Sequence, residues 1–231
     1  VGELYSITKL RKSLVDLTEC VGNEGYAFAN VTPIFRRNIE NDTVVVVFDI
    51  EKGKEVYVER VSISGHTKTK DYVVRRELRQ NEGARYNAEN VRRSKERLAR
   101  LNYIKNARFS NNQGSTDDQV EMNIDLEEGK SGTFSAGITY SQLNDLALTG
   151  RVEEQNLFGE GYRANISGDI GGATTNYSVS LVDPYFLSED VSASVSAFHA
   201  QTDLQSLVSY DQDSSGGSVG LSFALNEYAR Y

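Results

Sequence analysis

The chain has few of the residues that build metal centres, disulfides and most catalytic sites. Its 231 residues include one cysteine, two histidines, two prolines and no tryptophan. A single cysteine excludes an internal disulfide, and we expect Cys20 to lie on a helix as a half-buried structural thiol. One cysteine and two histidines do not supply the ligand cluster of a zinc site. No metal or other cofactor is therefore expected.

Long apolar runs are missing as well, and positive charge is scarce in the second part of the chain. No run approaches the roughly 20 residues that a membrane-spanning helix needs, so contact with a membrane would have to involve strands. Residues 1–130 carry 22 Lys+Arg and 21 Asp+Glu, whereas residues 131–231 carry 3 and 12. The two parts therefore suit different environments. Neither has the basic patch typical of nucleic-acid binding.

Residues 56–128 predict a compact module with the order β-α-α-β-β. Its first strand is an apolar-rich run that stops at Gly65, a turn residue. The expected elements are a strand at 56–63, a short helix capped by Thr69 or Asp71, a second helix capped by Asn87, and paired strands at 104–111 and 120–127. Each helix has one apolar stripe, formed by Val73, Val74 and Leu78 in the first and by Val91, Ser94, Leu98 and Leu101 in the second.

Residues 1–53 repeat part of this module. Ser6 or Thr8 is expected to begin a helix that ends near Gly22. Residues 26–30 and 43–50 are expected to form paired strands. This α-β-β order lacks the opening strand and first helix of the later module, so we expect the chain to be trimmed from a longer one.

From Phe134 onwards, apolar and polar residues alternate. The alternating runs are 134–141, 162–170, 177–181, 191–197 and 219–225, with turns expected at 156–161, 171–176, 184–190 and 211–217. One face of these strands is apolar, and the other is rich in Ser, Thr, Asn, Asp, Arg and Gly. That second face is too polar for the core of a soluble sandwich, which favours strands with lipid on one side and water on the other. A soluble antiparallel sheet with one wet face is the alternative.

Several separated motifs resemble the BamA family of outer-membrane protein assembly factors. They are VVRRELRQNEGARYN, SKERLARLNYIKNARF, VEMNIDLEEGKSGTFSAGITYS, EEQNLFGEGYRANISG, DPYF and FALNEY, in the family's order. The resemblance implies α+β POTRA modules (β-α-α-β-β) followed by antiparallel strands of a transmembrane β-barrel, here a partial barrel. Residues 1–53 would be a partial POTRA domain and residues 54–130 the complete, membrane-proximal one. Residues 131–231 would be the first strands of a barrel that has about 16.

The resemblance also implies a location and a role. The barrel would lie in the bacterial outer membrane and the POTRA domains in the periplasm, without enzyme activity. The partners would be unfolded outer-membrane protein clients, membrane lipid, and BamD-like and other assembly lipoproteins. In the family the first barrel strand pairs weakly with the last, and the C-terminal strand of a client pairs with the exposed edge, as in β-augmentation.

The resemblance places these two functions on particular residues. The first barrel strand is Gly132–Ser141, and its glycines weaken the strand and make its pairing easier to exchange. Its candidate gate residues are Gly132, Phe134, Ala136, Gly137, Ile138 and Tyr140. Lipoprotein docking is assigned by motif position to Arg75 and Glu82. Without the resemblance, those two would be read as charges on a solvated helix face and in a loop.

Other functions find less support. Residues 216–220 spell G-x-S-x-G, but Ser218 is expected to open a strand and not the strand-to-helix turn of a nucleophile. The run from Asp211 begins like a calcium loop, yet Ser222 stands where the bidentate glutamate belongs. Two further alternatives are a TamA-like or two-partner-secretion transporter of the same superfamily, and a soluble structural or adhesive β protein.

Overall fold

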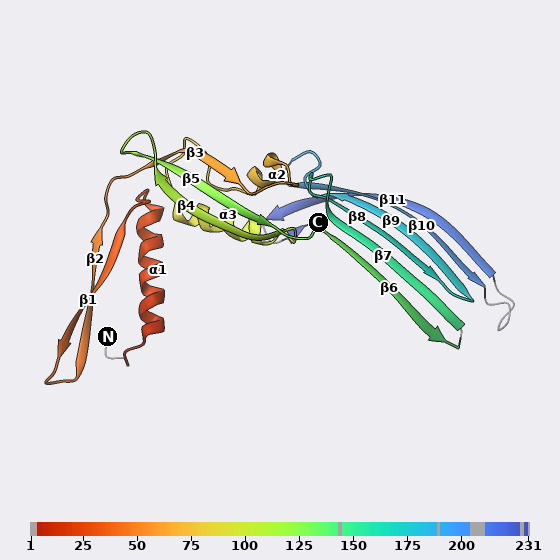
Figure 1. The fold of residues 1–231 in the computed structure, drawn as a ribbon, viewed down its shortest axis with the longest axis horizontal. Helices are drawn as coiled ribbons and strands as arrows, with labels where there is room; N and C mark the ends of the chain where they lie inside the picture. Colours follow the sequence, from red (N-terminus) through yellow and green to blue (C-terminus); the bar gives the residue numbers. More distant parts are fainter. Residues whose placement is uncertain (1–3, 143–144, 189, 204–210, 227–228, 231) are drawn as a thin grey trace. The chain divides into compact units, whose positions relative to one another are not determined.

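The chain forms two compact units, as shown in Figure 1. The computed structural model describes residues 4–142, 145–188, 190–203, 211–226 and 229–230. The first unit comprises Val1–Gly65 and Glu77–Glu127, and the second comprises His66–Arg76 and Glu128–Tyr231. Among the described residues, no helix is both long and apolar enough to cross a membrane.

The first unit opens with helix α1 (Ile7–Asn23), which begins at a predicted cap. The Ser6 hydroxyl accepts a hydrogen bond from the Lys9 backbone N–H at 3.5 Å. Cys20 lies on this helix as predicted, but it is exposed and not half-buried. The buried residue of this turn is the next one, Val21. One helical step rotates a side chain by about 100°, which carries Cys20 away from the buried face.

A two-stranded antiparallel sheet follows α1. It consists of β1 (Asn30–Asn38) and β2 (Thr43–Glu51). The second strand lies where it was predicted, whereas the prediction of a strand at 26–30 was wrong. Pro33 makes residues 30–38 look unlike a strand, but β1 is an edge strand in this sheet, and an edge tolerates a residue without an N–H.

The core of the first unit lies in a three-stranded sheet with the order β3-β5-β4. Its elements are β3 (Tyr57–Ser64), α3 (Ala88–Ala99), β4 (Ile104–Gln113) and β5 (Gln119–Glu128). Asn87 caps α3 as predicted, because its Oδ1 accepts from the Asn90 N–H at 3.0 Å. The fully buried apolar side chains are Val56, Val58, Val61, Leu98, Val120, Met122 and Ile124.

The helices of the predicted module are shorter than their apolar stripes suggested. Helix α2 spans only Asp71–Arg75, so Leu78 lies beyond it, and α3 ends before Leu101. The N-cap of α2 is Lys70, without a side-chain hydrogen bond, so the expectation that Thr69 or Asp71 caps this helix was wrong. The Thr69 hydroxyl is used in another contact of the second unit, described with the site.

The second unit is built on an antiparallel sheet in which consecutive strands are neighbours. Its strands are β6 (Gly132–Ser141), β7 (Asp145–Leu157), β8 (Tyr162–Ile170), β9 (Thr174–Asp183), β10 (Val191–Asp203), β11 (Asp211–Asn226) and the short β12 (Ala229–Arg230). The turn predicted at 211–217 was wrong, because these residues form the first part of β11. Gly216 faces Phe198 on β10, and a Cβ at Gly216 would lie 2.8 Å from the phenyl ring. This glycine therefore makes room for an aromatic side chain within a strand.

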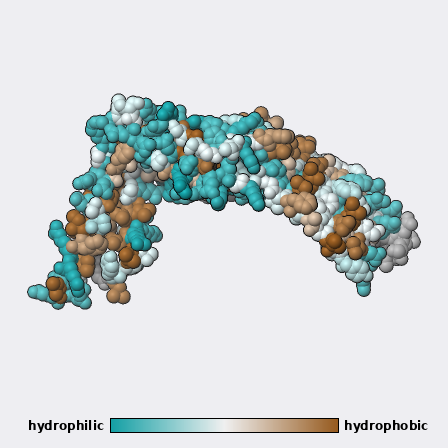
Figure 2. Space-filling view, viewed as in Figure 1, coloured by the Kyte–Doolittle hydropathy of each residue, from teal (hydrophilic) through white to brown (hydrophobic). Residues whose placement is uncertain are grey.

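The strand register gathers apolar side chains on one face of this sheet. Phe134 lies opposite Val152, Val152 opposite Ile166, and Ile166 opposite Val179. These four side chains remain between 47% and 73% exposed. Figure 2 shows apolar residues on the surface of this part of the chain. The predicted alternation is therefore present, and its apolar face is open to the surroundings.

Candidate functional site

Strand β6 lies at one end of the seven-stranded sheet. It pairs with β7 along its whole length, from Gly132 opposite Glu154 to Ser141 opposite Asp145. Among the described strands, its other edge has no partner. The row of main-chain groups on such an edge can accept a further strand. The candidate gate residues Gly132, Phe134, Ala136, Gly137, Ile138 and Tyr140 all lie on this strand and are exposed.

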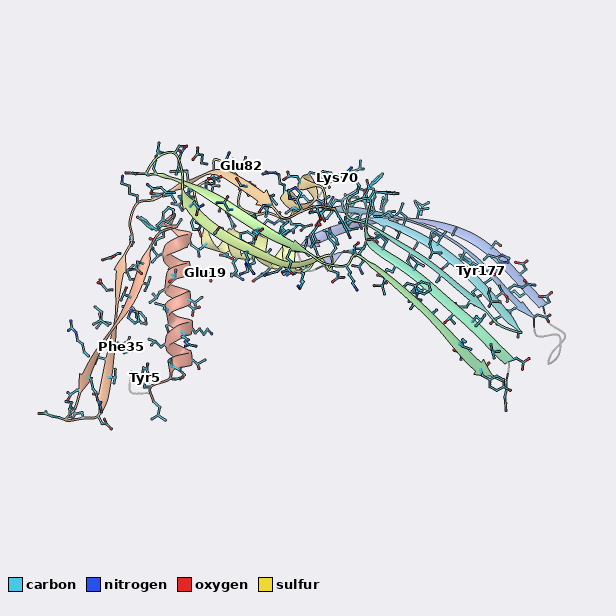
Figure 3. The ribbon with its side chains drawn as sticks, in the orientation of Figure 1. Tyr5, Glu19, Phe35, Lys70, Glu82 and Tyr177 are labelled. Carbon is cyan, nitrogen blue, oxygen red and sulfur yellow. The ribbon has the colours of Figure 1, made fainter. Side chains whose placement is uncertain are left out.

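The apolar face of the sheet becomes polar toward one end of β10 and β11. Val195 of β10 lies opposite Val219 of β11. Four residues further along β10, on the same face, His199 lies opposite Ser215. The His199 Nδ1 and Ser215 Oγ lie 2.8 Å apart. Tyr177 of β9 is the other neighbour of His199, and Figure 3 labels it. The apolar band therefore has a defined border, which an aromatic and two polar side chains mark.

Glu82, one of the two residues predicted to dock a lipoprotein, is bound to the edge of β3. Its Oε1 accepts a hydrogen bond from the Val61 N–H at 2.8 Å. The residues after Glu82 continue along the same edge, where Val58 receives the Gly83 N–H at its carbonyl and donates its own N–H to Ala84. Glu82 is exposed and is labelled in Figure 3. Its carboxylate thus has a structural role besides any contact with a partner.

Glu82 also lines a polar cleft of about 580 Å³. Arg60 and Glu121 form an ion pair at its wall, with 2.5 Å between Nη2 and Oε1, and this contact lowers the pKa of Glu121. Hydrogen bonds from the Ser115 hydroxyl and N–H lower the pKa of Glu59 in the same cleft. Glu59 and Glu121 are therefore ionised at neutral pH. Such a surface suits a partner with complementary positive charge.

Arg75, the other predicted docking residue, lies at the last position of α2. Its Nε donates to Asp71 Oδ2 at 2.6 Å, one helical turn earlier. The Arg75 side chain is 42% exposed. Arg75 and Glu82 belong to different compact units, so the structure describes each alone. Glu82 is tied to the edge of β3.

A third feature, which the sequence analysis missed, is a backbone turn held by Glu128. Its carboxylate accepts hydrogen bonds from the N–H groups of Thr67, Lys68 and Thr69 at 2.7–3.0 Å and from the Thr67 hydroxyl at 2.8 Å. Burial raises the pKa of Glu128, but these hydrogen bonds outweigh it and lower the pKa to about 2. Glu128 is therefore a permanent anion at neutral pH.

The same turn contacts the loop between β7 and β8. Asn156 Nδ2 donates to the Thr69 hydroxyl at 2.8 Å, and Asn156 Oδ1 accepts from the Gly161 N–H at 2.8 Å. Thr69 is 4% exposed and Asn156 is 8% exposed. The Lys70 N–H donates to the Gly159 carbonyl at 3.0 Å. Gly159 has φ +75, and a Cβ there would lie 2.1 Å from the Lys68 carbonyl oxygen, so only glycine fits this approach.

Two charged side chains extend this contact. Lys70, labelled in Figure 3, forms an ion pair with Glu160. Arg76 places its guanidinium 4.1 Å from the centre of the Tyr185 ring and donates to the Glu160 carbonyl at 3.3 Å. Residues 67–76 therefore hold the loops after β7 and β9 by backbone, amide, ionic and cation–π contacts. The sequence analysis gave these two residues only local roles, Thr69 as a candidate helix cap and Asn156 as the start of a turn.

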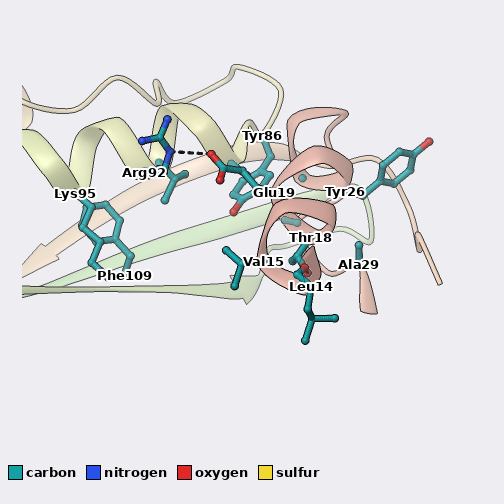
Figure 4. Close-up of a pocket in the computed structure, with 14 residues that line it drawn as sticks. Leu14, Val15, Thr18, Glu19, Tyr26, Ala29, Tyr86, Arg92, Lys95 and Phe109 are labelled. Atoms are coloured by element: carbon teal, nitrogen blue, oxygen red, sulfur yellow. Dashed lines mark hydrogen bonds and ion pairs between the residues drawn. The ribbon is translucent and has the colours of Figure 1, made fainter. Parts of the chain in front are cut away.

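The first unit contains an open apolar groove of about 460 Å³ between α1 and α3, shown in Figure 4. Leu14 and Val15 of α1 and Phe109 of β4 line it. Arg92 and Glu19 close part of it through an ion pair at 2.8 Å. An apolar groove with a polar rim is able to receive the apolar side chains of an extended segment.

Two family descriptions match the chain. "Surface antigen variable number repeat", the POTRA family, matches residues 1–53 and 56–129. The "Omp85 superfamily domain" matches residues 156–231. These matches fall on the two patterns that the composition and the strand alternation separated.

Individual proteins are similar to nearly the whole chain. The outer membrane protein assembly factor BamA of Neisseria meningitidis serogroup B is 33% identical over 99% of this chain and 29% of its own length. BamA of Nitratidesulfovibrio vulgaris is 27% identical over 92% of this chain and 26% of its own length. The crystal structure of BamA from Haemophilus ducreyi lacking POTRA domains 1–3 has a TM-score of 0.82 at 28% identity, over 98% of this chain and 43% of that one. The chain thus spans about a quarter to a third of these curated relatives.

Proposed function

Because the chain belongs to the BamA/Omp85 family, in which POTRA modules precede an outer-membrane barrel, we propose that it folds and inserts outer-membrane proteins. Membership of the family places the POTRA modules in the periplasm and the strands in the outer membrane, and it is not a family of enzymes. The domain division we propose is 1–53 for a partial POTRA domain, 54–130 for a complete one and 131–231 for the first barrel strands.

The observation that carries this proposal is the position of β6. It is the first strand of the sheet and pairs with β7 along its whole length. The apolar face that continues across its neighbours is exposed, as expected of a surface in contact with lipid. Gly137 lowers the stability of the strand, so its pairing is easier to exchange. In the proposed mechanism, the terminal strand of a client adds to the outer edge of β6, and the client then folds into the bilayer. This folding provides the driving force for insertion, so no nucleotide is needed.

A cysteine scan of full-length protein in outer membranes tests the pairing. Thr133→Cys and Ser135→Cys place thiols on β6, and Ser167→Cys places one on β8, which has neighbours on both sides. Cys20→Ser removes the exposed native thiol from every variant. A client with one cysteine in its last strand should form disulfides with the β6 variants only. Equal cross-linking to β6 and β8, or assembly without any cross-link to β6, would contradict the proposal.

We further propose that Arg75 and Glu82 contribute to the docking of an assembly lipoprotein, which is the role implied by their motif positions. The support for Glu82 is its exposed position at a cleft of ionised carboxylates. POTRA-mediated client handling is proposed for the apolar groove between α1 and α3.

The docking proposal needs variants that separate charge from structure. Glu82→Gln removes the charge but keeps an oxygen that can accept from the Val61 N–H. Glu59→Gln is the matched control in the same cleft. Glu82→Gln and Arg75→Glu should each weaken lipoprotein binding by several-fold, while amide exchange at Val61 remains slow. If binding is unchanged in both, or falls equally in Glu59→Gln, neither residue has a specific docking role.

A further inference from the structure

The turn at residues 67–70 is bound to the end of β5, just before the first hairpin, and to the end of β7, the second strand of that hairpin. Glu128, the last residue of β5, holds the turn through four hydrogen bonds, four residues before β6 begins. Asn156, next to the last residue of β7, holds it through the Thr69 hydroxyl. One short segment therefore links the chain that enters β6 to the end of β7, at the base of the hairpin.

One of these contacts is costly to break because it is buried. The hydrogen bond between Thr69 and Asn156 joins two buried side chains. Loss of either side chain leaves a buried polar atom without a hydrogen-bond partner. The base is closed further by the Gln155 N–H, which donates to the Ser131 carbonyl at 3.0 Å. The base of the hairpin is therefore held by contacts beyond the pairing of β6 with β7.

We propose that Thr69, Glu128 and Asn156 are positioning residues that keep the base of the β6–β7 hairpin paired while the outer edge of β6 exchanges partners. This proposal rests on the function proposed for β6. Its consequence is that β6 retains a fixed starting register for an incoming strand. A one-residue slip of β6 against β7 would turn the apolar side chains of β6 toward the wrong face, and a held base prevents such a slip.

Amide hydrogen exchange in full-length protein tests the anchor without reference to clients. Thr69→Val removes the hydroxyl and keeps the shape of the side chain. Amides of residues 132–135 and 153–155 should exchange about tenfold faster in Thr69→Val, because a buried hydrogen bond is lost. Thr43→Val, the same change at an exposed position of β2, is the control. Unchanged exchange at the base would overturn the proposal, whatever the clients do.

A covalent substitute for the buried bond tests its consequence for assembly. Thr69→Cys with Asn156→Cys, in the Cys20→Ser background, allows a disulfide in place of the 2.8 Å contact. The reduced state of the same variant is its control. With the disulfide closed, client strands should still cross-link to β6 and be inserted at the normal rate. If closure abolishes insertion, the base has to open and the proposal fails. If wild-type protein gives no cross-link to β6, the proposed function fails instead.

Discussion

The three-stranded sheet of the first unit and the seven-stranded sheet of the second use the same alternation of side chains with opposite results. In β5, Val120, Met122 and Ile124 are completely buried. In β6, Phe134 and Ile138 stand at equivalent alternate positions and are more than 70% exposed. Alternation therefore fixes which side chains share a face, but not what covers that face. In the first unit a helix lies against the sheet, whereas in the second we propose that lipid covers the face.

The two sheets should differ most in how much the free energy of unfolding falls when an isoleucine is replaced by alanine. Ile124→Ala removes a completely buried side chain and should lower the free energy of unfolding by about 2–5 kcal/mol. Ile138→Ala, at an exposed position of β6, should change it by less than about 1 kcal/mol in detergent. Denaturant titration followed by amide exchange in β5 and β6 measures both. Similar losses at the two positions would mean that β6 is packed against protein.

A second test compares a lysine placed on one face of β8 with a lysine placed on the other face. Ile166 and Ser167 are neighbours on β8 and lie on opposite faces, where Ser167 contacts Ser178 at 2.7 Å. Ile166→Lys should destabilise the protein in lipid vesicles by about 2–4 kcal/mol, as expected for a cation at the centre of a bilayer. Ser167→Lys should cost much less. The check is denaturant unfolding from vesicles, and a larger loss for Ser167→Lys would reverse the assignment of the faces.

The smallest expected effect is a pH dependence at the base of the hairpin. The pKa of Glu128 is about 2 in the folded protein, against 4.5 for an unperturbed glutamate side chain. A lowered pKa means that its stabilisation is complete above about pH 4.5 and is lost as the pH falls toward 2. The protection factors of the amides of residues 67–69, which correct for the intrinsic pH dependence of exchange, should therefore fall as the pH drops between these values, and Glu128→Gln should remove that change. A Glu128→Gln variant with an unaltered pH profile would show that another carboxylate is responsible.

The sequence predicted those elements that depend on local chemistry. The caps Ser6 and Asn87 were found because short polar side chains satisfy N-terminal N–H groups of a helix. Strand β6 and its exposed residues followed from alternation, and the family followed from motifs in their proper order. The docking roles of Arg75 and Glu82 and the pairing role of β6 remain predictions.

The sequence did not predict features that depend on contacts between distant residues. Gly216 looked like part of a turn, because nothing local shows that it faces Phe198 across a strand pair. Thr69 looked like a helix cap, yet its hydroxyl meets a residue 87 positions later. Such pairs have no periodicity, so pattern analysis of one sequence assigns each residue to the nearest local role.

Residues 82–86 cover part of the outer edge of β3 and so limit where the first unit can pair with a strand of another chain. Residues 82–86 follow that strand from Val61 back to Val56, so its main-chain groups there are already occupied. In a crowded compartment full of unfolded strands, an open parallel edge would be a hazard for uncontrolled aggregation. Closing this part of the edge from within the same chain leaves β4 as the opposite lateral border of the sheet, where we expect a further strand to join.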